Sequence, residues 1–181
     1  MNDGQAEAAV RAVLLTGRPG IGKTTVIRRL AELLTGWKVA GFYTDEIREE
    51  GHRRGFCVTT FSGGTGVLAH VELRSRQHVG KYGVDAAAFE QVVLPELARQ
   101  ADVFLVDEIG KMECFSAAFI ARMRELLAGP TPIVATVAVA GGGLVAEVKS
   151  RSDVELWQVT SRNRGALPGQ LVRRLESMRH V

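Results

Sequence analysis

The feature that most constrains this chain is a glycine-rich stretch set between an apolar run and an amphipathic one. Residues 17–24 read Gly-Arg-Pro-Gly-Ile-Gly-Lys-Thr and match the pattern G-x-x-x-x-G-K-[ST]. Val10–Leu15 before it is typical of a buried strand, and Thr24–Thr35 after it shows a helical period. Glycine permits backbone conformations that a Cβ forbids, so successive N–H groups can surround an anion at the helix N-terminus. The pattern therefore predicts a strand–loop–helix unit that holds phosphate.

The remaining sequence is typical of one globular domain. The chain has 181 residues, of which 46% are hydrophobic and 24% charged. A chain of this length buries enough surface to fold without disulfides or structural metal. No repeat or linker divides it, so we expect a single domain over residues 1–181. Strand-like and helix-like segments alternate, which predicts an α/β fold with a mostly parallel sheet and helices on both faces.

Three β-rich stretches interrupt this alternation, at Val39–Ile47, Gly55–Phe61 and Val67–Leu73, and predict an antiparallel hairpin insertion or sheet edge. Further along the chain, periodicity and capping residues predict alternating elements. These are a helix starting at Asp85, a strand over Val103–Val106, a helix over Phe115–Ala128, a strand over Ile133–Val139, a short helix over Leu144–Ser150, a strand over Val154–Thr160 and a last helix from Leu167.

Composition also excludes several classes of protein. Two cysteines cannot build a disulfide scaffold, so we expect no disulfide partner and a reducing, cytoplasmic location. No apolar run reaches the roughly 18 residues of a membrane span, and Met1–Ala9 lacks the basic-then-apolar pattern of a signal peptide. A net charge of +3 permits nucleic acid as a partner without indicating it. The cysteines and histidines do not show the spacing of a zinc site.

The residue types in the glycine-rich loop indicate a nucleoside triphosphate as the anion. We expect Lys23 to reach the β- and γ-phosphates and the Thr24 hydroxyl to bind Mg²⁺. Contacts to the nucleotide are expected from the whole loop, which consists of Gly17, Arg18, Pro19, Gly20, Ile21, Gly22, Lys23 and Thr24.

A second apolar run, Val103–Val106, ends in the acidic pair Asp107 and Glu108. Roughly 80 residues after a phosphate-binding loop, such a run is typical of a Walker B strand. Asp107 is expected to hold Mg²⁺, usually through water. Strand alternation directs Glu108 elsewhere, toward a water that faces the γ-phosphate, where a carboxylate can act as general base. A salt bridge or a helix-entry acid is the alternative for Glu108.

Other polar residues have two interpretations each. Lys111 could stabilise charge on the γ-phosphate or pair with Glu113. Thr136 could sense the γ-phosphate or be a satisfied core residue. Arg164 could stack on the base or reach a phosphate, and Asn163 could cap the last helix.

The basic stretch Arg48–Arg54 lies between two of the β-rich segments. It could close over a nucleotide, contact nucleic acid or form a solvated turn.

Taken together, these strings resemble the small P-loop nucleoside-triphosphatase family that includes the cancer-related nucleoside-triphosphatase. The string Asp-Glu-Ile-Gly-Lys-Met-Glu at residues 107–113 is the most specific, and Gly165 departs from the acidic or polar residue expected there. The resemblance covers nearly the whole chain and rests on Gly17–Thr25, Gly41–Arg48, Gly55–Phe56, Val106–Glu113, Ala135–Val137 and Asn163–Arg164.

The resemblance implies a RecA-like P-loop core and slow, Mg²⁺-dependent hydrolysis of ATP, GTP and other nucleoside triphosphates to the diphosphate and phosphate. It also implies nucleotide contacts from Gly17–Thr24 and Val103–Gly110, which adds Gly110 to the expected site, and we add Thr25. Lys23 and Glu108 are the expected catalytic residues. No strong arginine finger is evident in cis, so turnover is expected to be slow without a partner.

Two other functions remain open from the sequence. A nucleotide or small-molecule kinase shares the phosphate loop and could use residues 48–54 as a lid, and a nucleic-acid-stimulated ATPase would suit the mildly basic surface. The order of the strands in the sheet bears on the kinase alternative. RecA-like order places Ile133–Val137 between the strand before Gly17 and the strand before Asp107, whereas kinase-like order puts those two strands side by side.

Overall fold

The computed structural model describes residues 10–179, so the prediction about Met1–Ala9 lies outside the described residues. No helix in the described range is long and apolar enough to cross a membrane. The elements in chain order are β1 (Ala12–Thr16), α1 (Lys23–Leu33), β2 (Val39–Glu49), β3 (His52–Thr60), β4 (Thr65–His70), β5 (His78–Val79), β6 (Tyr82–Val84), α2 (Ala86–Leu97), β7 (Val103–Ile109), a 3₁₀ turn (Glu113–Phe115), α3 (Ala117–Ala128), β8 (Ile133–Val137), α4 (Leu144–Lys149), β9 (Val154–Gln158) and α5 (Leu167–Met178).

The strands of residues 10–179 form one sheet in the order β5-β6-β4-β3-β2-β7-β8-β1-β9. β8 lies between β1 and β7 and pairs in parallel with both. The RecA-like order is therefore confirmed, and the kinase-like order, with β1 beside β7, is not found. In this order the carboxyl ends of β1, β7 and β8 meet at one edge of the sheet, which is where α/β proteins bind ligands.

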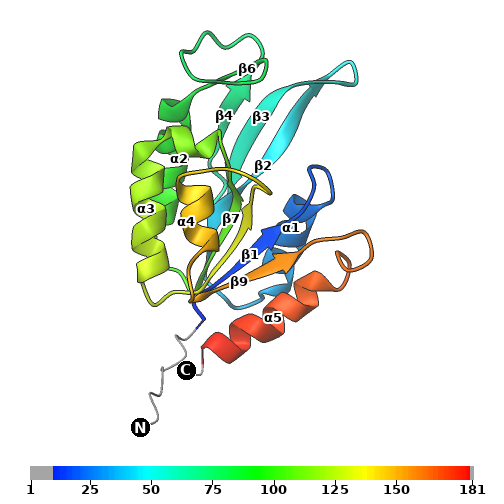
Figure 1. Ribbon diagram of the computed structural model, residues 1–181, viewed down its shortest axis with the longest axis vertical. Coiled ribbons are helices and arrows are strands. Elements are labelled where there is room, and N and C mark those ends of the chain that lie inside the picture. Colours follow the sequence, from blue (N-terminus) through cyan, green and yellow to red (C-terminus); the bar gives the residue numbers. More distant parts are fainter. Residues whose placement is uncertain (1–9, 180–181) are drawn as a thin grey trace.

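Alternate residues of the parallel strands pack into two separate hydrophobic clusters. On β1, Leu14 faces the cluster covered by α2, α3 and α4, whereas Val13 faces the cluster covered by α1 and α5. In the first cluster, Phe42, Phe89 and Phe119 form T-shaped contacts with ring centroids 5.3–5.9 Å apart. The prediction of helices on both faces is confirmed (Figure 1).

The three β-rich segments form the antiparallel edge of the same sheet rather than a separate insertion. β3 pairs antiparallel with β2 and β4, and β2 also pairs in parallel with β7. β2 therefore joins the antiparallel and parallel parts, and the β2–β3 hairpin projects past the carboxyl ends of the parallel strands (Figure 1). The short strands β5 and β6 continue this edge and were not predicted, because strands of two or three residues show no clear alternation.

The helix starts follow from local hydrogen bonding, with one correction. Asp85 caps α2 as predicted, since its side chain accepts a hydrogen bond of 2.9 Å from the N–H of Ala88. Asn163 does not cap α5, whose first turn has no side-chain cap. Its side-chain oxygen instead accepts from the N–H of Thr160 at 2.8 Å, and its amide donates to the Gln158 carbonyl. Asn163 thus stabilises the turn that follows β9.

Gly41 sets how closely β2 approaches β7, and we predict that Gly41→Ala is strongly destabilising. Its φ is +121°, and an added Cβ would lie 1.9 Å from the Leu105 carbonyl oxygen, so the two strands would have to separate. Gly36, with φ of +80° and nothing within 4 Å of an added Cβ, is the matched control for the backbone cost alone. In urea unfolding we expect Gly36→Ala to cost about 1 kcal/mol and Gly41→Ala about 4 kcal/mol. Equal losses would contradict this account of the β2–β7 contact.

Candidate active site

A cleft of about 630 Å³ opens at the carboxyl edge of the parallel strands. One wall is the loop between β1 and α1, the second is the β2–β3 hairpin, and the third comes from the ends of β7 and β8. Every expected loop contact in Gly17–Thr25 lines this cleft except Arg18 and Ile21. Arg18 is exposed, and Ile21 packs against the hydrophobic cluster under α1. These two residues of the predicted loop therefore do not line the cleft.

The glycine-rich loop has the backbone that its sequence predicts. Gly20 and Gly22 have φ values of +75° and +106°, which favour glycine, and α1 begins at the next residue. Lys23 is 8% exposed, and its Nζ donates a hydrogen bond of 3.0 Å to the Gly17 carbonyl. The ammonium group therefore reaches back across the loop, where the helix N-terminus also favours an anion.

Asp107 is buried at the floor of the site between two threonines. The Thr24 hydroxyl donates to one carboxylate oxygen at 2.6 Å, and the Thr136 hydroxyl donates to the other at 2.5 Å. Burial raises the pKa of Asp107, while these two hydrogen bonds and one from the Thr44 backbone lower it. Thr136 is thus a fully buried residue with a satisfied hydroxyl, as one of the two alternatives from the sequence expected, and that hydroxyl orients Asp107.

Glu108 lines the cleft beside the glycine-rich loop, and its expected role toward a water at the γ-phosphate stays a prediction. Its Oε2 lies 3.7 Å from the Lys23 Nζ, and its side chain lines the cleft. The pairing of β7 with β8 is irregular between Val106 and Ile109, so the period of two does not hold where the acids stand. Burial raises the pKa of Glu108, and the positive charge of Lys23 opposes this rise.

A third acid, Glu113, lies behind Glu108 and was not predicted as part of the site. A Cβ added to Gly110 would lie 2.9 Å from a carboxyl oxygen of Glu113 and 3.1 Å from one of Glu108, so both carboxyl groups approach Gly110. Gly110 therefore accommodates the two acids and does not line the cleft. Burial, with the charges of Glu108 and Asp107, raises the pKa of Glu113 to about 8. Within residues 10–179, Lys111 is exposed and forms no ion pair with Glu113.

Arg164 is placed at the outer side of the glycine-rich loop. Its guanidinium donates to the Ile21 carbonyl at 3.2 Å, and its side chain lies 3.5 Å from the point where a Cβ of Gly22 would stand. The loop that follows β9 thus comes next to the start of α1, but Arg164 does not line the cleft, and its contact with a nucleotide stays a prediction.

The wall formed by the β2–β3 hairpin is the part of the cleft that sequence reasoning largely missed. It consists of Thr44, Asp45 and Glu46 on β2 and of Arg53 and Phe56 on β3. The basic stretch at residues 48–54 was a signal for it. Nothing local in the sequence, however, shows that β2 pairs with β7 and so brings the hairpin beside Asp107.

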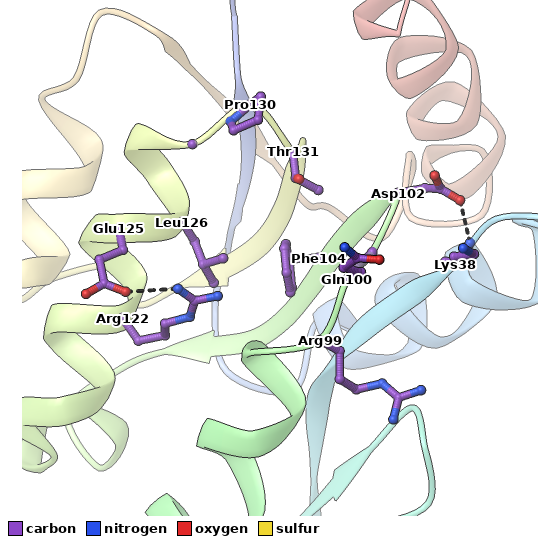
Figure 2. A pocket seen from close by; sticks show the side chains of 12 residues that line it. Lys38, Arg99, Gln100, Asp102, Phe104, Arg122, Glu125, Leu126, Pro130 and Thr131 are labelled. Carbon is purple, nitrogen blue, oxygen red and sulfur yellow. Dashed lines mark hydrogen bonds and ion pairs between the residues drawn. The ribbon is translucent and has the colours of Figure 1, made fainter.

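A second hollow, of about 480 Å³, lies at the opposite edge of the sheet, before the first residues of β2, β7 and β8 (Figure 2). Some of its charged side chains already have partners. Arg122 pairs with Glu125 at 2.9 Å, and Asp102 accepts from the backbone N–H of Lys38 at 2.7 Å. This hollow holds none of the residues predicted from the sequence to act on a nucleotide, so we take the cleft at the carboxyl edge as the candidate site.

Comparison with known proteins gives consistent matches. The model of a family described as NTPase matches residues 12–172. The cancer-related nucleoside-triphosphatase of Homo sapiens is 44% identical, with 93% of this chain and 98% of that protein covered. The nucleoside-triphosphatase THEP1 of a Thermotoga species is 37% identical, with 88% and 92% covered. The crystal structure of THEP1 from Aquifex aeolicus superposes with a TM-score of 0.84 at 32% identity, with 91% and 99% covered.

The burial of Glu113 predicts a specific dependence of stability on pH. Its pKa is about 8 in the folded chain against an ordinary 4.5, so the folded state keeps a proton that the unfolded state loses between these values. The contribution of protonated Glu113 to the stability of the folded state is therefore complete below pH 4.5 and is lost as the pH rises through about 8. Between about pH 5 and pH 8, we expect the free energy of unfolding of the wild type to fall by on the order of 3 kcal/mol relative to Glu113→Gln.

Urea unfolding at the two pH values measures this difference. Glu125→Gln is the matched control, because Glu125 is an exposed acid on α3. A Glu113→Gln variant whose stability followed the wild type in parallel at both pH values would contradict the prediction.

Proposed function

The chain belongs to the nucleoside-triphosphatase family, and on that basis we propose that it hydrolyses ATP, GTP and other nucleoside triphosphates to the diphosphate and phosphate. The observation that carries the proposal is that Lys23, Thr24 and Glu108 line one cleft, with Asp107 buried behind Thr24 and accepting its hydrogen bond. In this reading the glycine-rich loop binds the triphosphate through its N–H groups, and Lys23 neutralises charge on the β- and γ-oxygens.

The donor set beside the loop fits Mg²⁺. The Thr24 hydroxyl and the Asp107 carboxylate are adjacent oxygen ligands, which this ion prefers. Within residues 10–179 no group of three His, Cys, Asp or Glu side chains could hold a metal alone, which suits an ion that binds largely through phosphate and water. When bound, the ion would supply neutralisation of phosphate charge, while Thr136 keeps Asp107 oriented toward it.

Glu108 is proposed as the general base. Its carboxylate lines the cleft and is held near the loop by Lys23. Glu108 accepts a proton from a water, the water oxygen forms a bond to the γ-phosphorus, and the bond to the bridging oxygen breaks. The electron pair of that bond stays on the departing diphosphate. The work of the protein is positioning and electrostatic stabilisation, with little covalent chemistry of its own.

We also propose that the protein accepts nucleotides with different nucleobases and that its turnover is slow. Arg164 beside Gly22 can stack on any base, because stacking reads no base edge. Turnover is expected to be slow, because Arg53, the arginine that lines the cleft, would first have to leave the Glu46 carboxylate. The names of the relatives favour water over an organic acceptor, which sets the kinase alternative aside.

We predict that Glu108→Gln slows ATP hydrolysis by roughly 10²- to 10⁴-fold and leaves the affinity for ATP within a few-fold of the wild type. The amide keeps the size of the side chain but cannot accept the proton. Steady-state phosphate release and equilibrium binding measure the two effects, with Glu125→Gln on the far side of the molecule as control. Wild-type turnover in Glu108→Gln would remove Glu108 from the role of base. Transfer of labelled γ-phosphate to a nucleoside or nucleoside monophosphate would instead show a kinase.

We also predict a strict requirement for a divalent cation. Chelation with EDTA should abolish phosphate release, and added Mg²⁺ should restore it. Thr24→Val should raise the Mg²⁺ concentration needed for half-maximal activity by 10-fold or more, because it removes a ligand without changing the size of the side chain. Undiminished hydrolysis in EDTA would contradict the Mg²⁺ assignment.

A further inference from the structure

The β2–β3 hairpin places an arginine opposite the glycine-rich loop. Arg53 lines the cleft together with Lys23 and Glu108. Along β2, the Thr44 N–H donates to the buried Asp107 carboxylate. Glu46 follows two residues later and thus stands about 7 Å further along the strand. Glu46 binds Arg53 at 2.5 Å, which keeps this guanidinium on the hairpin wall of the cleft.

An irregularity in the hairpin accounts for the direction of Arg53. Glu46 pairs with Phe56 and Ile47 with Gly55, but Arg48 then pairs with Arg53, so one residue of β3 is passed over. A bulge of this kind moves the next side chain to the other face of the strand. Arg53 consequently lies over the ring of Phe56, 5.5 Å from its centroid, and both side chains line the cleft.

The partner of Arg53 is an oxyanion that a phosphate can replace. The planar guanidinium fork binds carboxylate and phosphate oxygens in the same way. Glu46 does not depend on Arg53 alone, since Arg48 binds it at 2.6 Å. Burial would raise the pKa of Glu46, but its hydrogen bond to Arg48 and the charges of both arginines lower it overall. Glu46 can thus remain ionised and paired when Arg53 turns to another anion.

The other arginines near the cleft are placed differently. Arg48 shares Glu46 but does not line the cleft, Arg28 pairs with Asp45, and Arg164 lies at the outer side of the loop. Among the described residues, Arg53 is the arginine that lines the cleft. It is also 44% exposed, so its side chain has room to move.

We propose that Arg53 is a catalytic residue that leaves Glu46 when a nucleoside triphosphate fills the cleft and donates hydrogen bonds to the γ-phosphate oxygens. There it stabilises the charge that develops while the bond to the bridging oxygen breaks. No bond to Arg53 forms, and no proton leaves it. The inference rests on the proposed hydrolysis of nucleoside triphosphates.

The test compares Arg53→Gln with Arg48→Gln, since both arginines bind Glu46 from the same hairpin and only the first lines the cleft. We expect Arg53→Gln to lower kcat for ATP by about 100-fold, with ADP affinity unchanged, and Arg48→Gln to stay within about 2-fold of the wild type. Binding of ADP with aluminium fluoride, which mimics the γ-phosphoryl group in transfer, should weaken in Arg53→Gln alone. Arg53→Lys should recover only part of the loss, because a point charge lacks the fork.

Several outcomes would overturn the inference. Equal kcat values for Arg53→Gln and Arg48→Gln would do so while leaving the proposed hydrolysis intact, provided that Glu108→Gln is still slow. A loss in Glu46→Gln as large as that in Arg53→Gln would show that the pair only maintains the hairpin. If the folded wild type hydrolyses no nucleoside triphosphate at all, the proposed function itself fails. Thermal unfolding of each variant separates these results from a failure to fold.

Discussion

The hydrogen bond from the Thr24 hydroxyl to the Asp107 carboxylate is the contact on which the site depends. It joins the first turn of α1 to the end of β7 across 83 residues of sequence. The second oxygen of Asp107 accepts from Thr136 on β8, the strand between β1 and β7. A buried carboxylate is costly unless donors satisfy it, and here donors come from three separate segments. The requirement can be met only when β1, β8 and β7 are correctly ordered, so the site forms with the parallel sheet.

The electrostatic balance of the site explains why it suits an anion that carries a cation. Three acids, Asp107, Glu108 and Glu113, lie close together, and the charge of Lys23 lowers the pKa of only the first two. Burial raises the pKa of each of these acids, which measures the cost of concentrating carboxyl groups in a poorly solvated place. A triphosphate alone would add all of its negative charge, whereas a divalent cation bound with it would offset part of that charge. The same acids therefore favour a nucleotide that carries a divalent cation over one that does not.

The phosphate loop, the strand before Asp107 and the cap at Asp85 were predictable because their signals are local. A glycine-rich loop between a strand and a helix, an apolar run ending in acids, and an aspartate before an apolar period each depend on neighbouring residues. The wall of the cleft at Arg53 and Phe56 could not be predicted in this way. It depends on the parallel pairing of β2 with β7 and on a skipped residue in β3. The placement of both Asp107 and Glu108 at the site also depends on a non-local feature, since the pairing of β7 with β8 is broken between Val106 and Ile109. Asn163 was assigned to a helix cap although the turn after β9 competes for the same side chain.

The parallel and the antiparallel parts of the sheet contribute different residues to the cleft. The parallel part supplies the loop, the acids and their donors, and its geometry is set by buried contacts on both faces. The antiparallel hairpin supplies the opposite wall and is attached to this part through β2, with exposed ion pairs near its tip. Exposed pairs contribute little to stability and are easily exchanged. A hairpin held in this way can change its contacts in the cleft while the Thr24–Asp107 contact persists, so affinity for the triphosphate and stabilisation of its reacting end can be set by different parts of one sheet.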